Sequence, residues 1–180
     1  MKSAFKMLWE GAGMADRSVH YEAAFEGFLR ERGVPYVAVD EAKKALFSNA
    51  KLKSFDFVVY SKSGPNLLID VKGRQARQKA AASRATFQTW ATERDVDDLL
   101  QWQQVFGEGF SAVLAFVYWI DPPMLPEPGM FAFRDRWYAL MGIDLKEYRD
   151  HMRRRSEKWG TVCLSVDDYR QLARPLEQWL

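Results

Sequence analysis

The sequence predicts a single α/β domain, in which a helix, three strands, a second helix and a fourth strand follow one another over residues 18–120. Its 180 residues, 48% of them hydrophobic and 14% aromatic, suffice for one well-packed core and are too few for two domains of ordinary size. Apolar residues recur at helical spacing in some segments and form short β-rich runs in others. We expect residues 121–180 to add a β-hairpin and helices to this core as a C-terminal elaboration of the same domain.

The first predicted elements are a helix and a short strand. Ser18 is a suitable N-cap, and apolar residues follow it at helical spacing up to about Arg32. Gly33 stands where a helix C-cap belongs, and Pro35 prevents the helix from continuing. Residues 36–39 then predict a strand, which leads into a polar, lysine-rich connection.

The middle of the chain predicts a hairpin, a helix and a buried strand. Residues 55–60 and 66–71 are two β-rich runs, and the Ser61-Lys-Ser-Gly-Pro65 segment between them is typical of a hairpin. Residues 93–106 have the apolar spacing of an amphipathic helix. Residues 111–120 form an almost continuous apolar run of strand length, as in a strand that is buried on both faces.

The C-terminal part predicts a second hairpin and further helices. Residues 130–143 form the hairpin, and Asp144 opens a helix over about residues 145–155 with an acidic residue three positions later, as in a capping box. A strand at residues 161–166 and a last helix from Asp167 complete the chain.

Composition excludes several classes of protein. The formal net charge of +2 does not indicate nucleic-acid binding by the whole surface, so a local patch would have to provide it. The single cysteine, Cys163, excludes an intramolecular disulfide, fits a reducing compartment, and lies in a predicted core strand. The longest apolar run, residues 112–120, is too short to cross a bilayer, and residues 1–10 lack the features of a signal peptide. We therefore expect a soluble, cytoplasmic protein with no membrane partner.

The predicted hairpin brings two acidic residues together. With the turn centred on Ser63, residues whose numbers add up to 126 face each other, so Asp56 lies opposite Asp70. Side chains alternate between the faces of a strand, which places both carboxylates and Lys72 on one face. Opposed positions in an antiparallel pair have Cβ atoms about 5 Å apart, and like charges there destabilise the pair. A divalent cation would compensate this repulsion.

Magnesium favours oxygen ligands and is often held by one or two carboxylates together with phosphate oxygens. Such an ion lowers the pKa of bound water and polarises a phosphate. Lys72, about 6–7 Å further along the strand, could orient the attacking water or neutralise charge that develops on the phosphate. The alternative is that Asp56 and Asp70 are ordinary strand-end residues and that Lys72 is only an ion-pair partner. Gly73 favours the first interpretation, because a glycine inside a strand marks a close approach by another group.

These residues, Asp56 and Asp70-Val-Lys72, preceded by a helix that contains Glu22, resemble the PD-(D/E)XK nuclease superfamily, which includes restriction endonucleases and archaeal Holliday-junction resolvases. The core of that superfamily runs helix, three strands, helix, strand, so the resemblance covers residues 18–120 and implies a restriction-endonuclease-like fold. Two departures are Phe55, where the motif has proline, and aspartate rather than the commoner glutamate at position 70.

The resemblance also implies a ligand set. Mg²⁺, which Mn²⁺ can replace, would be held by Asp56, Asp70, the main-chain carbonyl of Val71 and a helix carboxylate, with Lys72 as the catalytic lysine. In the resolvase-like members, a helix glutamate lies about three turns before the glycine that ends the first helix. Glu22 matches that placement, and Glu26, one turn later on the same face, is the alternative.

A basic stretch follows the predicted site. No acidic residue lies between Asp70 and Glu93, and the stretch includes four cationic residues beyond the motif: Arg74, Arg77, Lys79 and Arg84. Such a segment could bind the DNA backbone beside the scissile bond, or it could be a solvated loop. Arg153–Arg155 are weaker evidence for binding of the DNA backbone, because cations at a helix C-terminus complement its dipole and a structural role is at least as common.

Several other polar and aromatic residues are expected to have structural roles. Gln103 lies near the apolar stripe of the second helix and is either a residue that touches the site or, more commonly, a structural hydrogen-bonding group. His20 and His151 have no metal-ligand spacing and are expected at helix surfaces. The seven tryptophans are expected in the core rather than as platforms for stacked bases, because none lies in a basic run.

The sequence therefore predicts a Mg²⁺-dependent nuclease that cleaves DNA, including branched DNA, and that is either monomeric or a homodimer with residues 121–160 as the candidate contact. Two other functions stay open. One is a non-catalytic module that binds nucleic acid or a protein partner on the same fold, and the other is metal-dependent hydrolysis of a different phosphoester.

Overall fold

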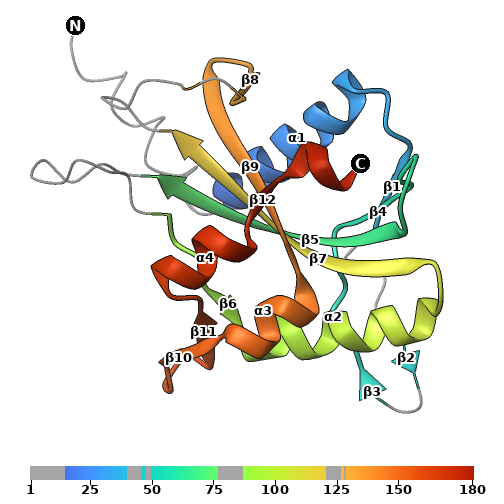
Figure 1. Cartoon of the computed structure of the whole chain (residues 1–180), viewed down its shortest axis with the longest axis vertical. Helices are drawn as coiled ribbons and strands as arrows, with labels where there is room; N and C mark the ends of the chain where they lie inside the picture. The colour runs from blue at the N-terminus through green and yellow to red at the C-terminus, as the bar shows by residue number, and fades with distance from the viewer. Residues whose placement is uncertain (1–14, 40–45, 48–49, 77–86, 121–126, 128) are drawn as a thin grey trace, which may run out of the picture.

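A mixed seven-stranded sheet forms the centre of the computed structural model, which describes residues 15–39, 46–47, 50–76, 87–120, 127 and 129–180 (Figure 1). Six strands follow one another across the sheet, and β8 (Phe131–Phe133) pairs with β9 beside them. Their order is β1 (Tyr36–Ala38), β4 (Phe57–Val59), β5 (Asn66–Ala76), β7 (Phe110–Ile120), β9 (Arg136–Asp144) and β12 (Arg174–Pro175).

Helices cover both faces of this sheet (Figure 1). On one face, α1 (Ala15–Glu31) packs over β4, β5 and β7; on the other lie α2 (Glu93–Phe106) and α3 (Leu145–His151). A second sheet joins β10 (Arg153–Ser156), β11 (Thr161–Cys163) and β6 (Ala91–Thr92). The smaller elements are the β2–β3 pair (Leu46–Phe47 and Ala50–Lys51), α4 (Val166–Leu172) and the 3₁₀ helix η1 (Leu176–Trp179).

Helix α1 ends where the sequence predicts but begins earlier. Gly33 adopts a φ of +60°, and its N–H and that of Val34 bond back to the carbonyls of Arg30 and Leu29, which closes the helix with a left-handed cap. The helix already begins at Ala15. Ser18 is therefore an internal residue of α1, and its predicted role as the N-cap is wrong.

The β4–β5 hairpin has the predicted register. Val58 faces Leu68, and the pairs on either side also add up to 126. However, β4 covers only residues 57–59, whereas the prediction was 55–60, so Asp56 lies just outside the strand. Strand β5 is longer than predicted and continues through Ala76.

Strand β5 pairs in parallel with β7 along its whole length, and α2 forms the crossover between them. The bounds of α2 are those that the sequence predicts. Thr92 caps its N-terminus in a reciprocal capping box with Asp95, and Gly107 ends it at a φ of +76°. This parallel pair at the centre of the sheet places the middle of β5 between helices on both faces.

The C-terminal residues extend the sheet instead of lying apart from it, since β9 pairs antiparallel with β7 from Trp137 to Asp144. Asp144 caps α3 as predicted, accepting from the N–H groups of Lys146 and Glu147. The prediction for the end of this helix is wrong: α3 ends at His151, and Arg153–Arg155 belong to β10. The seven residues of α3, about two turns, are followed at Met152 by extended backbone, so Arg153–Arg155 lie in a strand and not in the last turn of the helix, where they would complement its dipole.

The two faces of the sheet carry separate cores. The α1 face is rich in aromatic contacts, such as Phe25 with Phe57 at a ring distance of 4.9 Å. The α2 face buries Val96 and Leu99 of the helix against the even-numbered residues of β7, such as Leu114. No helix in the described part of the chain has the length and apolar character that a bilayer crossing requires.

Candidate active site

Asp70 and Lys72 are neighbours on the same face of β5. They alternate with Ile69 and Val71, which point to the α1 face, so both charged side chains point toward α2. The residues are only 6% and 8% exposed. The Nζ of Lys72 lies 2.5 Å from Oδ2 of Asp70, and this ion pair is the centre of the candidate site.

Asp56 lies beside Asp70, bonded to the residues on either side of it. Its N–H donates to the carbonyl of Ile69 at 2.9 Å, and its Oδ2 accepts the N–H of Val71 at 2.5 Å. The main-chain carbonyl of Asp56 also accepts from Val39 of the segment after β1. Where β4 separates from β5, the Asp56 side chain thus takes the place of a main-chain hydrogen-bond acceptor. This bond fixes the Asp56 carboxylate beside Val71, between Asp70 and Lys72.

Helix α2 adds a carboxylate that the sequence interpretation missed. Asp95 is 7% exposed, and its Oδ2 lies 3.0 Å from the Nζ of Lys72, while its Oδ1 lies 2.5 Å from the Nζ of Lys53. Lys72 therefore bridges Asp70 and Asp95, and Asp95 bridges two lysines. The signal was present in the sequence, because Asp95 shares the apolar stripe of the helix with Leu99, four residues later.

The N-terminus of α2 fixes Asp95. Its Oδ2 accepts the N–H of Thr92 at 3.0 Å, and its own N–H donates to the Thr92 hydroxyl. A carboxylate in the first turn of a helix is also stabilised by the helix dipole. Asp95 is thus a rigid support for the two ammonium groups.

Burial and the lysines move the pKa values of the two acids in opposite directions. Burial raises the pKa of Asp70, and the attraction of Lys72 offsets only part of that increase. Burial would also raise the pKa of Asp95, but Lys72 and the hydrogen bond and charge of Lys53 together hold it well below the usual range. Burial lowers the pKa of Lys53, but the hydrogen bond to Asp95 and the charges of Asp95 and the other nearby carboxylates together raise it above the usual value. Asp95 therefore keeps its charge, and Asp70 is the acid that a further cation would stabilise most.

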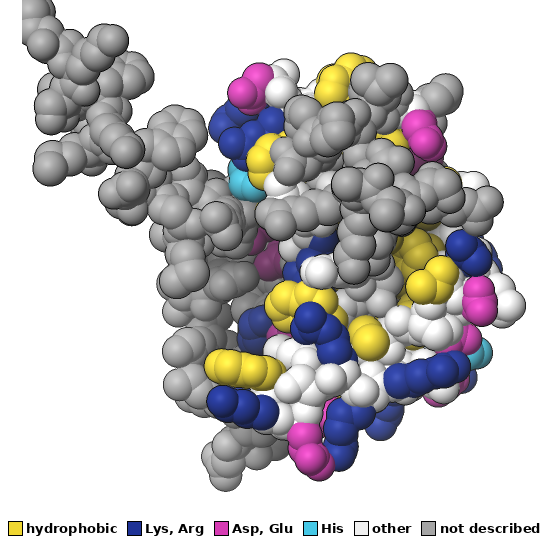
Figure 2. Space-filling view, turned by 90° about the vertical axis from the view of Figure 1, so that its left-hand side faces the viewer, with side chains coloured by type: hydrophobic (Ala, Val, Ile, Leu, Met, Phe, Trp, Pro, Cys, Tyr) yellow, Lys and Arg dark blue, Asp and Glu magenta, His cyan; other side chains and the backbone are white. Residues whose placement is uncertain are grey.

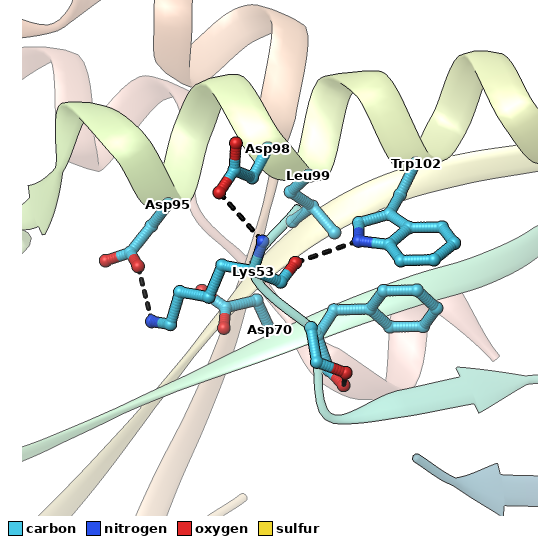
Figure 3. Close-up of a pocket in the computed structure, with 8 residues that line it drawn as sticks. Lys53, Asp70, Asp95, Asp98, Leu99 and Trp102 are labelled. Atoms are coloured by element: carbon cyan, nitrogen blue, oxygen red, sulfur yellow. Dashed lines mark hydrogen bonds and ion pairs between the residues drawn. The ribbon is translucent and has the colours of Figure 1, made fainter. Parts of the chain in front are cut away.

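The segment before β4 closes one side of a pocket with an empty volume of about 180 Å³ that is partly open to solvent (Figure 3). Lys53 runs beneath α2, its N–H bonded to Asp98 at 2.9 Å and its carbonyl to the indole N–H of Trp102 at 2.8 Å. Asp70 lies below, on β5, and its side chain lines the same pocket. Asp70 and Asp95 therefore both line a pocket that is partly open to solvent.

Glu22 and Glu26 lie at different heights along α1. Tyr21, next to Glu22, packs on Gly73, where a Cβ would lie 2.2 Å from the tyrosine ring. Glu26 accepts hydrogen bonds from the Tyr36 hydroxyl at 2.6 Å and from Arg30 at 2.7 Å. Glu22 is therefore near the Gly73 part of β5, on the α1 face of the sheet, whereas Glu26 is bound to Tyr36 of β1 at the far end of the hairpin. The close approach inferred from Gly73 is that of the Tyr21 ring.

Of the four predicted basic residues, Arg74 lies in the described part of the chain, and Arg77, Lys79 and Arg84 lie outside it. Arg74 packs its guanidinium 3.7 Å from the ring centre of Trp90 and donates to the main-chain carbonyls of Gly73 and Trp90. Burial lowers its pKa to about 10, which leaves it charged at neutral pH. Its contact with DNA stays a prediction.

The remaining polar residues have structural contacts. The Oε1 of Gln103 accepts the N–H of Ala112 in β7, which agrees with the structural interpretation. His20 is half-buried, with Nδ1 3.0 Å from the Tyr138 hydroxyl, and His151 is exposed. The expectation that the tryptophans lie in the core is wrong for two of them: Trp159 is 72% and Trp137 is 42% exposed.

Within the described residues, no three His, Cys, Asp or Glu side chains gather closely enough to hold a metal ion by themselves. The structure therefore does not bring Glu22, Asp56 and Asp70 together as a complete set of side-chain ligands. The donors that it does bring together are hard oxygen atoms of two carboxylates, those of Asp56 and Asp70, along the edge of β5. This donor chemistry suits Mg²⁺ or Mn²⁺, with other oxygen atoms completing the coordination.

The fold has a counterpart among solved structures. The chain superimposes on the Holliday junction resolvase Hjc of Archaeoglobus fulgidus with a TM-score of 0.54 and 14% sequence identity, over 89% of this chain and 98% of the resolvase. The fold is restriction-endonuclease-like. The fold class predicted from the sequence is thus confirmed, as is its similarity to archaeal resolvases. No protein-family model and no curated protein matches the chain.

Proposed function

We propose that this chain is a divalent-metal-dependent nuclease that hydrolyses phosphodiester bonds in DNA. The observation that carries the proposal is the burial of Asp70 and Lys72 as adjacent partners on β5, with the Asp56 carboxylate bound beside them. A fold shared with a resolvase supports it. Buried charges are costly unless they have a role, and phosphodiester cleavage gives each of these residues one.

The proposed metal ligands are Asp56, Asp70 and the carbonyl of Val71. In a strand, the N–H and C=O of one residue point toward the same neighbour. Because the Val71 N–H points to the Asp56 carboxylate, its carbonyl faces the same side. A bound Mg²⁺ or Mn²⁺ would lower the pKa of a water molecule and polarise the phosphate.

Lys72 is the proposed catalytic lysine. A metal on Asp70 would weaken its ion pair with Lys72, whereas Asp95, which lies 3.0 Å from the Lys72 ammonium, would remain its partner. From there Lys72 would donate a hydrogen bond to the attacking water or to a non-bridging phosphate oxygen, where negative charge develops. Glu22, on α1, is the proposed third carboxylate, and it would act through a water molecule.

The test is a cleavage panel with Mg²⁺, Mn²⁺ or EDTA. Its substrates are four-way junctions, flaps, linear duplexes and single strands of DNA, with matched RNA. The junction is included because the structural neighbour is named as a Holliday junction resolvase. We expect cleavage of DNA with either metal and none with EDTA; if every substrate stays intact with both metals, the proposal is overturned.

A second candidate function is a module that binds DNA without cutting it. The observation that favours it is the balance of charge in the cluster, in which two lysines already neutralise Asp70 and Asp95. This function predicts binding that does not depend on metal and no turnover, so the same panel, read by both gel shift and cleavage, distinguishes the two.

Two further properties are proposals. A homodimer through residues 121–160 is one, and light scattering after gel filtration measures it. A cytoplasmic location is the other; it is supported by the single, unpaired Cys163.

A further inference from the structure

An exposed tryptophan lies at the tip of the β10–β11 hairpin. The N–H of Gly160 bonds to the carbonyl of Glu157 at 3.2 Å, so Lys158 and Trp159 occupy the two central positions of a β-turn. Trp159 is 72% exposed, and the Nζ of Lys158 lies 5.5 Å from its ring centre. The Trp159 ring is thus surrounded by solvent and has a cation beside it, so it does not contribute to the core.

A second tryptophan lies at the other end of the same small sheet. Trp90, half-buried, directly precedes β6 and lies between two guanidinium groups: that of Arg74 is 3.7 Å and that of Arg155 is 5.3 Å from its ring centre. Among the residues that the structure describes, no carboxylate lies within ion-pair distance of Arg155 or Lys158. The positive charges beside both rings are therefore not neutralised by acidic side chains of the described chain.

We define the arginine–tryptophan surface as Trp90, Arg155, Lys158 and Trp159. Figure 2 views this side of the molecule, where dark blue and yellow side chains lie next to one another over the lower part. Exposed arginines of β10 extend it, although they have acidic neighbours: Arg153 lies 3.4 Å from Asp168, and Arg154 lies 3.1 Å from Glu157. Exposed ion pairs of this kind contribute little, so a phosphate can replace the acidic partner.

The surface is linked to the candidate active site through neighbouring residues of β5 and of α2. Arg74, which holds the inner face of the surface through Trp90, is on β5 two residues after Lys72. On the other side, β6 pairs with β11 and leads directly into α2, whose first turn carries Asp95. The surface is thus joined to the site by neighbouring residues of β5 and by the first turn of α2.

We propose that the arginine–tryptophan surface binds an unpaired DNA strand next to the scissile bond, with a base stacked on Trp159, phosphates bound by Arg155 and Lys158, and Trp90 holding the Arg155 guanidinium in place. Aromatic rings that alternate with cations are the pattern of single-strand binding, because every base has a π-face and every phosphate a charge. Inside a duplex, each paired base is already stacked on both of its faces, so it has no free face to place on Trp159. The inference rests on the proposed function and narrows its substrate to DNA with unpaired bases, such as a tail, flap or open junction.

The test measures binding of fluorescent oligonucleotides by anisotropy in EDTA, so that no cleavage occurs. The probes are a single strand of about 16 nucleotides, the blunt duplex of the same sequence, and that duplex with an unpaired tail. We expect Trp159→Ala to weaken binding of the single strand and the tailed duplex by about tenfold or more, with little change for the blunt duplex. Trp159→Phe, which keeps an aromatic face, retains most of the affinity.

Two matched controls accompany these variants. Trp137→Ala removes another exposed tryptophan, on β9, and should leave all three affinities unchanged. Arg155→Ala should reduce the slope of log affinity against log salt by about 0.7 for the single strand, the loss of one phosphate contact, whereas Arg30→Ala on α1 should not. Thermal unfolding checks that each variant is folded.

The proposal is overturned if Trp159→Ala leaves binding of the tailed duplex unchanged, if it weakens the blunt duplex equally, or if Trp137→Ala has the same effect. Wild-type protein that does not bind the single strand also overturns it. Cleavage without dependence on Trp159 would refute this inference and leave the proposed nuclease standing. Binding that depends on Trp159, without any cleavage, would refute the nuclease and leave the surface standing.

Discussion

Lys72 is the residue on which the candidate site depends. Its ammonium lies between two buried carboxylates, at 2.5 Å from Asp70 and 3.0 Å from Asp95. Removing one partner from a buried ion pair leaves an uncompensated charge and is strongly destabilising. With two acidic partners on different elements, Lys72 keeps a partner when Asp70 binds another cation, and Asp95 becomes the residue that positions it.

Asp95→Asn should therefore lower kcat for DNA cleavage by about tenfold or more, because a small displacement of a catalytic group is costly. KM for DNA should change little, since Asp95 contacts the lysines and not the solvent. Initial rates over a range of DNA concentrations separate the two constants. Asp97→Asn, an exposed position on the same helix, is the control. An unchanged kcat for Asp95→Asn would show that Lys72 needs no support from α2.

The same variant tests the electrostatics of the metal-free protein. Because the pKa of Asp95 is lowered by folding, its ionised form stabilises the folded state at pH values above the unfolded pKa of about 3.9. That stability is lost as the pH falls toward the folded pKa. We expect Asp95→Asn to lower the free energy of unfolding by about 3 kcal/mol at pH 7 and by progressively less below pH 4. Urea unfolding at several pH values measures the difference; a constant difference across this range would contradict the assignment.

The motif residues could be predicted from the sequence, whereas the contacts that Asp95 and Lys53 make with them could not. Asp56, Asp70 and Lys72 follow from alternation and hairpin register, which are local. Asp95 and Lys53 reach the site through the packing of α2 against the segment before β4, and no local pattern specifies that contact. Trp159 was assigned to the core with the other tryptophans because none lies in a basic run, yet the turn that Gly160 closes directs it outward.

At the scale of elements, the contact between α1 and β5 determines where Glu22 lies relative to β5. Tyr21 packs directly on Gly73, so the absence of a side chain at Gly73 determines how closely α1 approaches the strand. Glu22 follows Tyr21 in sequence, so the same contact determines how close this part of α1 lies to β5. The glycine thus connects the packing of the helix to the proposed active site.

Gly73→Ala should destabilise the protein by about 1–3 kcal/mol, the usual cost of overpacking a core, because the new Cβ would lie 2.2 Å from the Tyr21 ring. Cleavage should fall as well, since α1 must shift away from β5. Gly64→Ala, where a Cβ meets only the Ser61 hydroxyl at 3.5 Å, is the matched control. Equal stability of the two variants in chemical unfolding would contradict this account of the α1–β5 contact.

Most elements of the main sheet follow from sequence patterns, and the errors occur where tertiary contacts override them. The apolar pattern and the caps give α2 its bounds. Strand β4 is shorter than its apolar run because Asp56 uses its side chain, and not the main chain, to bond Val71. Helix α3 ends before the arginines because β10 pairs with β11. The charged, polar sequence of β10 gives no alternation that indicates a strand.

At the scale of the whole molecule, the C-terminal residues complete the core that surrounds the candidate site. Strand β9 covers the outer edge of β7, and η1 packs beneath it, with the side chain of Trp179 against Gly142. Leu176 is completely buried in the same core as the residues of α1. The structural similarity to the resolvase covers 89% of the chain and so continues beyond residue 120, where the sequence predicts the start of an elaboration. We therefore expect the two parts to fold together.

Leu176→Ala should lower the free energy of unfolding by about 2–5 kcal/mol, as expected for a large-to-small change in a core. Val166→Ala, at a position that is 63% exposed, should change it by less than about 0.5 kcal/mol. Both should unfold in one cooperative transition by circular dichroism. A separate early transition in Leu176→Ala would mean that the C-terminal part folds independently of the core.

The most direct test of the central claim is the rate of metal-dependent DNA cleavage by Asp70→Asn, Lys72→Ala and the double variant, with Asp98→Asn as the control. Asp98 lines the same pocket and is equally buried, but its bonds are to Lys53 and Arg94. We expect the Asp70 and Lys72 variants to lose cleavage in Mg²⁺ while they keep their fold by circular dichroism, and Asp98→Asn to remain active. Cleavage that persists in a folded double variant would contradict the assignment of the active site.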